Sequence, residues 1–284
     1  MLKDYYQLVK PGMIYGNVVT VSAGFALASR GVIDWVLFIA TLAGISLVIA
    51  SGCVFNNYID RDTDAKMERT KNRALVRGAI SARAALIYGT CLGGAGFLVL
   101  GIYTNLLATS AAAVGFFFYI VMYSLWFKRR SIHGPIVGSV SGAVPPVVGY
   151  AAVTNDFDTG AAILFAILVL WQIPHFYAIS IYRLNDYIAA SIPTLPEKKG
   201  MRGTKIRILL HVIAFAVAAV MPTVFGYTGY AYAAVAGALG LLWLGVCIKG
   251  FWAVDPKRWA RKMFVFSLVV IMGLCITMAV DIVA

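Results

Sequence analysis

Long apolar segments separated by short polar segments run along nearly the whole chain. An α-helix needs roughly 20 apolar residues to cross a bilayer. The pattern therefore predicts an all-α, polytopic membrane bundle of nine helices, at about residues 13–29, 35–57, 84–103, 105–127, 134–154, 160–182, 206–226, 229–248 and 263–282. Because the helices fill the chain, residues 1–284 are predicted to form a single transmembrane domain.

The composition agrees with this interpretation. Hydrophobic residues make up 61% and charged residues 13% of the chain, against about 45–50% and 25% in an ordinary soluble domain. A soluble core could not bury this excess of apolar surface. The expected partner of the outer surface is therefore the lipid bilayer.

The net charge of +12 and the pI near 9.6 would suggest nucleic acid as a partner of a soluble protein. Here the basic residues can be assigned to loops on one side. With a cytoplasmic N-terminus, 23 of the 24 Lys and Arg residues lie on the cytoplasmic side and only Arg30 lies outside, as the positive-inside rule requires. We therefore expect no nucleic acid partner, a bacterial inner-membrane location and a periplasmic C-terminus behind Asp281.

The first apolar segment is predicted to stay in the mature protein. It has no small-residue cleavage site and is followed at once by a second span, so it differs from a signal peptide. The four cysteines lie inside apolar spans and form no C-x-x-C or C-x-x-C-H motif. We expect buried, reduced thiols without a disulfide or a covalent heme, at Cys53, Cys91, Cys247 and Cys275.

Ionisable side chains are absent from the middle of the predicted spans, apart from His175 and His211. Proton-coupled transporters usually carry such groups at membrane depth, so this class is disfavoured. Half of the 12 acidic residues cluster instead in two predicted cytoplasmic segments, and the site should open to the cytoplasm. These six residues are Asp60, Asp62, Asp64, Glu68, Asp186 and Glu197.

The first acidic segment follows the second predicted span. If that helix continues, Asn56, Asp60 and Asp64 lie at positions i, i+4 and i+8 on one face, whereas Asp62 points elsewhere. Magnesium is typically bound by one or two carboxylates together with phosphate oxygens of a substrate. The spacing therefore predicts a Mg²⁺-diphosphate site.

Acidic residues at the C-terminal end of a helix need a compensating positive charge, because the helix dipole is negative there. A metal would supply it, and the basic residues Arg69, Lys71 and Arg73 directly downstream could bind the remaining phosphate charge. The alternative is a solvated loop whose basic residues only set the topology.

Two later segments add candidate residues. Tyr123, Lys128 and Arg129 end the fourth span, where an aromatic belt followed by positive-inside residues is the simpler explanation. In the sixth span, Pro174 is expected to kink the helix and to free backbone groups beside His175 that need a partner.

These residues resemble the motifs of the UbiA-type intramembrane prenyltransferases, and in particular those of the branch that farnesylates heme. The family motif N-x-x-x-D-x-x-x-D matches Asn56, Asp60 and Asp64, and its Y-x-x-x-x-K-R element matches residues 123–129. The similarity covers essentially the whole chain, including residues 141–146 and 174–196. It departs from the wider family where the second motif, D-x-x-x-D, has Asp186 followed by Ala190.

The resemblance implies nine helices around a central cavity, with farnesyl diphosphate as donor and heme b (protoheme IX) as acceptor. Mg²⁺-dependent loss of diphosphate would leave an allylic cation for a heme vinyl group, and water would complete the product. The product would pass to a heme-copper terminal oxidase pathway. The implied metal-binding and catalytic residues are Asn56, Asp60, Asp64 and Asp186. The implied diphosphate-binding residues are Arg69, Lys71, Arg73, Lys128, Arg129 and Arg183, with Tyr123 and Tyr182 as further site residues.

His175 is the candidate heme-binding residue. It precedes Asp186 by two to three helical turns, so it should lie deeper than the diphosphate, and imidazole is a common axial ligand of heme iron. The alternative is a histidine that binds the backbone carbonyls freed by Pro174. His133 and His211 are weaker candidates because neither lies beside an acidic motif.

The fifth span is rich in small residues. It could leave a flat slot for a macrocycle, or it could pack closely against neighbouring helices through Gly138 and Gly142. Two further functions stay open: prenylation of a quinone or chlorin precursor, and heme handling or transport without catalysis. Pigment extraction from expressing cells distinguishes heme farnesylation from prenylation of another precursor. Diphosphate release from farnesyl diphosphate distinguishes a prenyltransferase from a protein that only handles or transports heme.

Overall fold

The computed structural model describes residues 1–283, and in these residues nine helices are long and apolar enough to cross a membrane. This number confirms the prediction. One isolated β-bridge, between Thr228 and Ile282, is the extent of β-structure in the described chain. The α-helices are α1 (Leu2–Leu8), α2 (Pro11–Ser29), α3 (Trp35–Ile59), α4 (Arg61–Asp64), α5 (Ala82–Tyr103), α6 (Leu106–Phe117), α7 (Lys128–Arg130), α8 (Gly134–Thr154), α9 (Thr159–Tyr182), α10 (Leu184–Ala189), α11 (Leu195–Val224), α12 (Tyr230–Lys249) and α13 (Pro256–Val280). A π-helix, η1 (Phe118–Phe127), joins α6 to α7, and a short 3₁₀-helix, η2 (Gly250–Trp252), follows α12.

Several helices extend beyond the predicted apolar segments. α11 begins at Leu195 and breaks at Gly200, whose φ of 71° is left-handed, although the apolar segment was expected to start at residue 206. α13 begins at Pro256, with the Asp255 carboxylate accepting from the first backbone amides. Hydropathy marks only the lipid-facing part of a helix, whereas backbone hydrogen bonds and caps set where the helix begins.

Side-chain caps account for much of the remaining polar sequence between the spans. Asp34 accepts from the amides of residues 36 and 37, Asn105 from residue 108 and Asp158 from residue 161. Ser81 accepts in the same way from residue 84. Because each of these side chains satisfies an otherwise unpaired helix N-terminus, their place in the sequence is explained by helix initiation.

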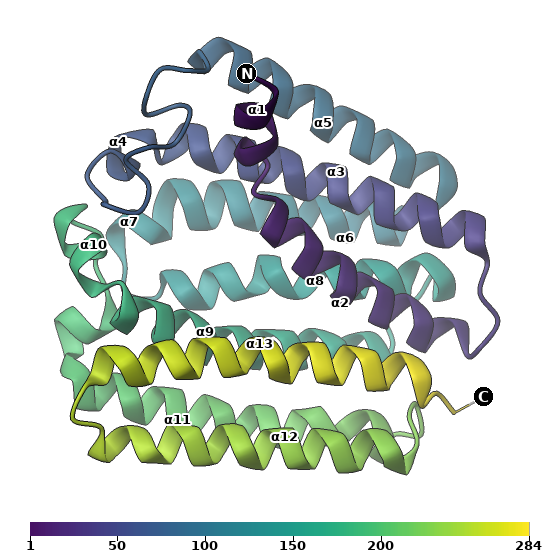
Figure 1. Ribbon diagram of the computed structural model, residues 1–284. Helices are drawn as coiled ribbons and strands as arrows, with labels where there is room; N and C mark the ends of the chain where they lie inside the picture. The colour runs from purple at the N-terminus through teal and green to yellow at the C-terminus, as the bar shows by residue number, and fades with distance from the viewer. Residues whose placement is uncertain (284) are drawn as a thin grey trace.

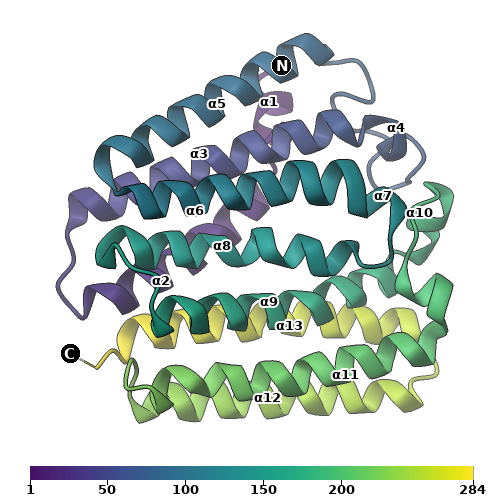
Figure 2. The same ribbon diagram turned by 180° about the vertical axis from the view of Figure 1, so that it is seen from behind.

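The spans lie side by side and roughly parallel in the two opposite views (Figure 1, Figure 2). α8 packs against α2, α6 and α9, and α9 also packs against α11 and α13. α3 and α5 form a pair at one side of the bundle, and α11 and α12 form a pair at the other. The short helices α4, α7 and α10 gather at one end of the bundle, whereas the described chain ends at the opposite end (Figure 1).

α2 and α8 approach so closely that glycine is required at their contact. A β-carbon at Gly24 would collide with the backbone of Pro146, and one at Gly149 would lie 3.0 Å from the Phe25 amide nitrogen. Small residues allow this kind of backbone contact between membrane helices. The crossing fixes α2 against the most deeply buried helix of the bundle.

The Gly24→Ala variant should therefore destabilise the protein by about 1–3 kcal/mol, the cost of overpacking a filled interface. Gly16→Ala is the matched control, because Gly16 lies in the same helix with no atom within 4 Å of its added β-carbon. Thermal unfolding in detergent would measure the difference. Equal melting temperatures for the two variants would contradict the contact.

The small residues of α8 serve helix packing. A β-carbon at Gly138 would lie 3.2 Å from the Tyr123 ring, and one at Gly142 would collide with the Gln172 side chain. Pro145 is buried within the helix. Of the two explanations for this span, close packing is the one that the structure supports.

The cysteine prediction is partly wrong. All four thiols are free and three are buried, but Cys91 is exposed. The reason lies in the helical period: Gly89 and Gly93 face Ser51 and its neighbours on α3, and a residue two positions from each lies on the opposite side of a helix. Cys91 therefore lies on the outer surface of α5.

Candidate active site

The three residues of the first acidic motif follow one another at successive helical turns. The Asp60 amide donates to the Asn56 carbonyl over 2.9 Å, and the Asp64 amide donates to the Asp60 carbonyl over 2.7 Å. The helical hydrogen-bonding pattern thus continues from α3 into α4, as predicted. The exposed fractions of Asn56, Asp60 and Asp64 are 3%, 0% and 2%, so this end of the helix is enclosed by protein.

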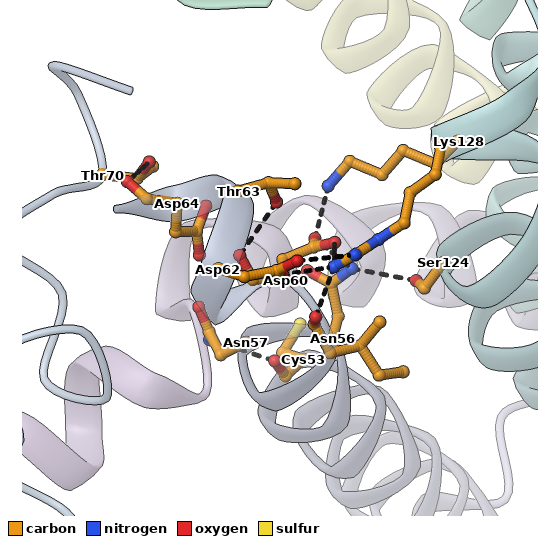
Figure 3. Close-up of polar contacts among 12 residues, drawn as sticks. Cys53, Asn56, Asn57, Asp60, Asp62, Thr63, Asp64, Thr70, Ser124 and Lys128 are labelled. Atoms are coloured by element: carbon orange, nitrogen blue, oxygen red, sulfur yellow. Dashed lines mark hydrogen bonds and ion pairs between the residues drawn. The ribbon is translucent and has the colours of Figure 1, made fainter. Parts of the chain in front are cut away.

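A hydrogen-bond network fixes the orientation of the Asn56 amide (Figure 3). Its nitrogen donates to Asp60 Oδ2 and to Ser124 Oγ, each over 2.9 Å. Ser124 in turn donates to the Tyr119 carbonyl, so its oxygen is free to accept. The Asn56 amide oxygen accepts from the Lys10 ammonium over 2.5 Å.

The two acidic side chains of the motif, and Asp62 between them, each have a basic partner. Lys128 pairs with Asp60 Oδ2, and Arg73 pairs with Asp64 Oδ2 over 2.5 Å. Arg129 forms a bidentate pair with Asp62, over 2.9 and 2.6 Å. Buried carboxylates are stable only when such partners offset the loss of solvation.

Arg129 and Asp62 belong to the rim of this cluster. Arg129 also donates to the Ile59 carbonyl at the C-terminal end of α3 over 2.5 Å, where a positive charge is favourable. The hydrogen bond from Arg129 lowers the pKa of Asp62 to about 2. Because the Asp62 side chain is 61% exposed, it points away from the buried face, as predicted.

One oxygen of Asp60 fits a metal ligand. Asp60 Oδ1 is buried without a hydrogen-bond partner, and Arg129 Nη2 lies 3.9 Å from it. A buried carboxylate oxygen normally has a partner. Within residues 1–283 no three His, Cys, Asp or Glu side chains gather as a complete metal site. Mg²⁺ does not require one, since substrate phosphates and water supply several of its ligands.

Lys10 was missed by the sequence analysis. It precedes α2 with a left-handed φ of 52°, and its partly buried ammonium contacts Asn56. Burial, followed by the nearby Arg73 and Lys128 charges, lowers the pKa of Lys10 to about 8. The one sequence signal for Lys10 was its place as a basic residue at the cytoplasmic start of the first span. The positive-inside rule already explained a basic residue there, so it did not stand out as a site residue.

A cavity of about 340 Å³ lies beside this cluster, at the end of the bundle where α9, α10 and α11 meet η1 and α7. Aromatic side chains form much of its wall. Lys128 connects the two features, because it lines the cavity and pairs with Asp60. The predicted site residues in the wall are Arg69, Tyr123, Lys128, Tyr182 and Arg183, and the wall also includes Phe176, Tyr187 and Phe264.

The π-helix η1 positions both Tyr123 and Ser124. π-helices are rare and occur often at functional sites, and this one spans ten residues. Ser124 faces Asn56, while Tyr123 lines the cavity. Lys128 follows directly after η1, so one continuous segment contributes to both the polar cluster and the cavity wall.

Other predicted residues lie apart from the cluster. Lys71 pairs with exposed Glu68 over 2.6 Å. Asp186 lines a second cavity of about 130 Å³, together with Arg183 and Lys257. The Arg183 guanidinium lies 4.4 Å from the centre of the Tyr182 ring.

His175 lies behind the cavity wall. It is 8% exposed and contacts Trp171, Phe176 and Phe264. Its Nδ1 atom is 2.7 Å from Ser267 Oγ, so its polar partner is a side chain of α13 rather than a carbonyl freed by Pro174.

Comparison with solved structures places this helix arrangement in a known fold. A digeranylgeranylglyceryl phosphate synthase has a TM-score of 0.82 at 18% identity, covering 99% of this chain and 98% of that one. A UbiA homolog from Archaeoglobus fulgidus bound to GPP and Mg²⁺ has a TM-score of 0.71 at 14% identity, covering 96% and 99%.

Sequence comparison gives a closer relationship. A protoheme IX farnesyltransferase of Cronobacter sakazakii is 56% identical over 281 residues, which cover 99% of this chain and 95% of that protein. The profile of the UbiA prenyltransferase family matches residues 17–269. The chain is thus a multi-pass membrane protein that belongs to the UbiA prenyltransferase family.

Proposed function

We propose that this protein transfers the farnesyl group of farnesyl diphosphate to a vinyl group of protoheme IX, giving heme O. The observation that carries the proposal is the position of Asp60, which has a buried, unpartnered oxygen next to a lysine that lines an aromatic cavity. The full-length similarity to protoheme IX farnesyltransferases supports the choice of both substrates.

The basic side chains would bind the diphosphate and stabilise it as it leaves. Lys128 faces the cavity from the side of Asp60, and Arg69 and Arg183 face it from other segments. Such preorganised charges favour the transition state in which negative charge develops on the leaving group. Lys10 and Arg73 complete the positive environment around the motif.

Asn56, Asp60 and Asp64 are proposed to bind Mg²⁺ together, and Asp186, which lies apart from them, is proposed to bind metal alone or through water. When bound, Mg²⁺ would supply electrostatic stabilisation of the diphosphate. The Mg²⁺ in the structure of a related UbiA homolog supports this choice. Lys10 and Lys128 contact the Asn56 and Asp60 oxygens, so positive charge already lies beside these two residues.

The aromatic wall of the cavity would accommodate the prenyl chain and exclude water from the reactive carbon. Tyr123, Phe176 and Tyr182 line the space next to Lys128. Excluding water prevents hydrolysis of an allylic cation before the acceptor reacts. His175 remains our candidate for contact with the heme.

Pigment extraction from cells that express the protein tests the acceptor. We expect a farnesylated heme that is absent from cells with the empty vector. A prenylated quinone or chlorin precursor in its place would assign the same diphosphate site to another acceptor. A separate assay of diphosphate release from farnesyl diphosphate by the purified protein distinguishes catalysis from heme handling, in which no diphosphate is released.

The proposed site opens to the cytoplasmic side of a bacterial inner membrane. Two observations support this orientation. The basic residues of the sequence are assigned almost entirely to the cytoplasmic side, and α4, α7 and α10, which border the proposed site, lie together at one end of the bundle (Figure 1). Reporter fusions after Arg130 and Arg202 should therefore report the cytoplasm, and fusions near Asn155 and at the C-terminus should report the periplasm. A cytoplasmic C-terminus would contradict the orientation.

The product would serve a heme-copper terminal oxidase pathway.

A further inference from the structure

His175 and Ser267 form a buried polar pair between α9 and α13, and the proposed diphosphate chemistry gives this pair no role. His175 Nδ1 and Ser267 Oγ are 2.7 Å apart. The imidazole is otherwise surrounded by the rings of Trp171, Phe176 and Phe264, with centroid distances of 4.8, 5.6 and 4.9 Å. A polar side chain in such surroundings needs an explanation.

Two short contacts of the Ser267 hydroxyl determine which imidazole nitrogen carries the proton. Ser267 Oγ lies 2.6 Å from the Phe264 carbonyl oxygen. Two oxygens at this distance need a hydrogen between them, and a carbonyl has none to give, so the serine proton lies there. The contact to His175 must then use a proton of Nδ1, because a hydroxyl has only one.

The second imidazole nitrogen, Nε2, is left with a free lone pair. Among the described residues, His175 forms its one hydrogen bond through Nδ1. A histidine that binds a metal through one nitrogen almost always donates the other N–H to a fixed acceptor, which sets the ring orientation and raises its basicity. Ser267 provides such an acceptor.

The pair lies next to the cavity. Phe176 and Phe264 line the cavity and also contact the imidazole. Trp171 donates its indole N–H to the Ser267 carbonyl over 2.8 Å, which fixes one aromatic neighbour of the ring. The imidazole therefore lies directly behind two side chains of the cavity wall.

We propose that Ser267 is a positioning residue, which fixes His175 with Nδ1 protonated and its Nε2 lone pair available to the iron of the heme acceptor. This inference rests on the proposed function, because it requires heme as a substrate. It assigns no chemical step to Ser267. Imidazole ligation would instead orient the porphyrin in the site.

Heme titration of the purified protein, followed by its absorption spectrum, tests the inference. His175→Ala should lose the imidazole-ligated spectrum and recover it when imidazole is added. Ser267→Ala should weaken heme affinity by about 10-fold, the lower end of the effect of removing a ligand-orienting partner, and should shift the heme absorption band. Ser267→Thr retains a hydroxyl and should behave like the parent.

Ser29→Ala is the matched control. Ser29 is also a buried helical serine, but its hydroxyl donates only to the Phe25 carbonyl, so its loss should leave the spectrum unchanged. A parental spectrum and affinity in Ser267→Ala or in His175→Ala would overturn the inference. Formation of farnesylated heme by the parent is measured in a separate assay. That assay tests the proposed function, whereas the spectra and affinities of the variants test the role of Ser267.

Discussion

The Asp60→Asn variant is expected to lose at least about a hundredfold in turnover, because removing one group that stabilises transition-state charge typically costs 10²–10³ in rate. Asparagine has nearly the shape of aspartate, but it removes the negative charge beside Lys128 and replaces one of the two carboxylate oxygens with an amide nitrogen. Asp64→Asn should have a comparable effect through the loss of its pair with Arg73. Farnesylation of heme by the reconstituted protein measures both.

Asp62→Asn is the internal control for this prediction. Asp62 belongs to the same segment and pairs with Arg129, but its side chain is largely exposed. Its loss should therefore reduce turnover only slightly. Equal losses at all three positions would contradict the assignment of Asp60 and Asp64 to one functional face. Thermal unfolding would identify variants that lose activity by unfolding, since breaking a buried ion pair can cost about 3–5 kcal/mol.

Removing divalent metal should abolish turnover in the parent protein, and adding back Mg²⁺ should restore it. The physical reason is the charge on the leaving diphosphate, which the basic residues of the cavity offset only in part. The assay compares product formation with EDTA, and with EDTA followed by excess Mg²⁺. Full activity in EDTA would exclude the metal.

The dependence on Mg²⁺ concentration also locates the site. Asn56→Ala removes an amide oxygen that faces the cluster, so it should raise the Mg²⁺ concentration needed for half-maximal turnover. Asp62→Asn should keep the parental Mg²⁺ dependence because its carboxylate pairs with Arg129 outside the buried face. An unchanged Mg²⁺ dependence in Asn56→Ala would exclude this residue as a ligand.

Two sequence signals predicted much of the fold and one face of the site: the length of the apolar segments and the four-residue spacing of the motif. Hydropathy alone gave the number of spans, because the bilayer imposes a minimum apolar length on each helix. The spacing of Asn56, Asp60 and Asp64 gave their common face, because residues four apart are neighbours on a helix. The profile match confirms the family resemblance on which the implied chemistry depended.

Residues that reach the site from distant elements could not be predicted in the same way. Lys10 and Ser124 contact Asn56 across 46 and 68 positions of the chain, and such contacts depend on packing rather than on local spacing. The position of Lys71, which pairs with Glu68, likewise depends on the path of the segment after α4. The π-helix that orients Ser124 has no reliable sequence signal.

The most direct test of the central claim is analysis by mass spectrometry of heme incubated with the purified protein, farnesyl diphosphate and Mg²⁺. We predict that the parent converts protoheme IX to its farnesylated product and releases diphosphate, whereas Asp60→Asn leaves both substrates unchanged. Unmodified heme with the folded parent, or farnesylated heme at the parental rate with Asp60→Asn, would contradict the account.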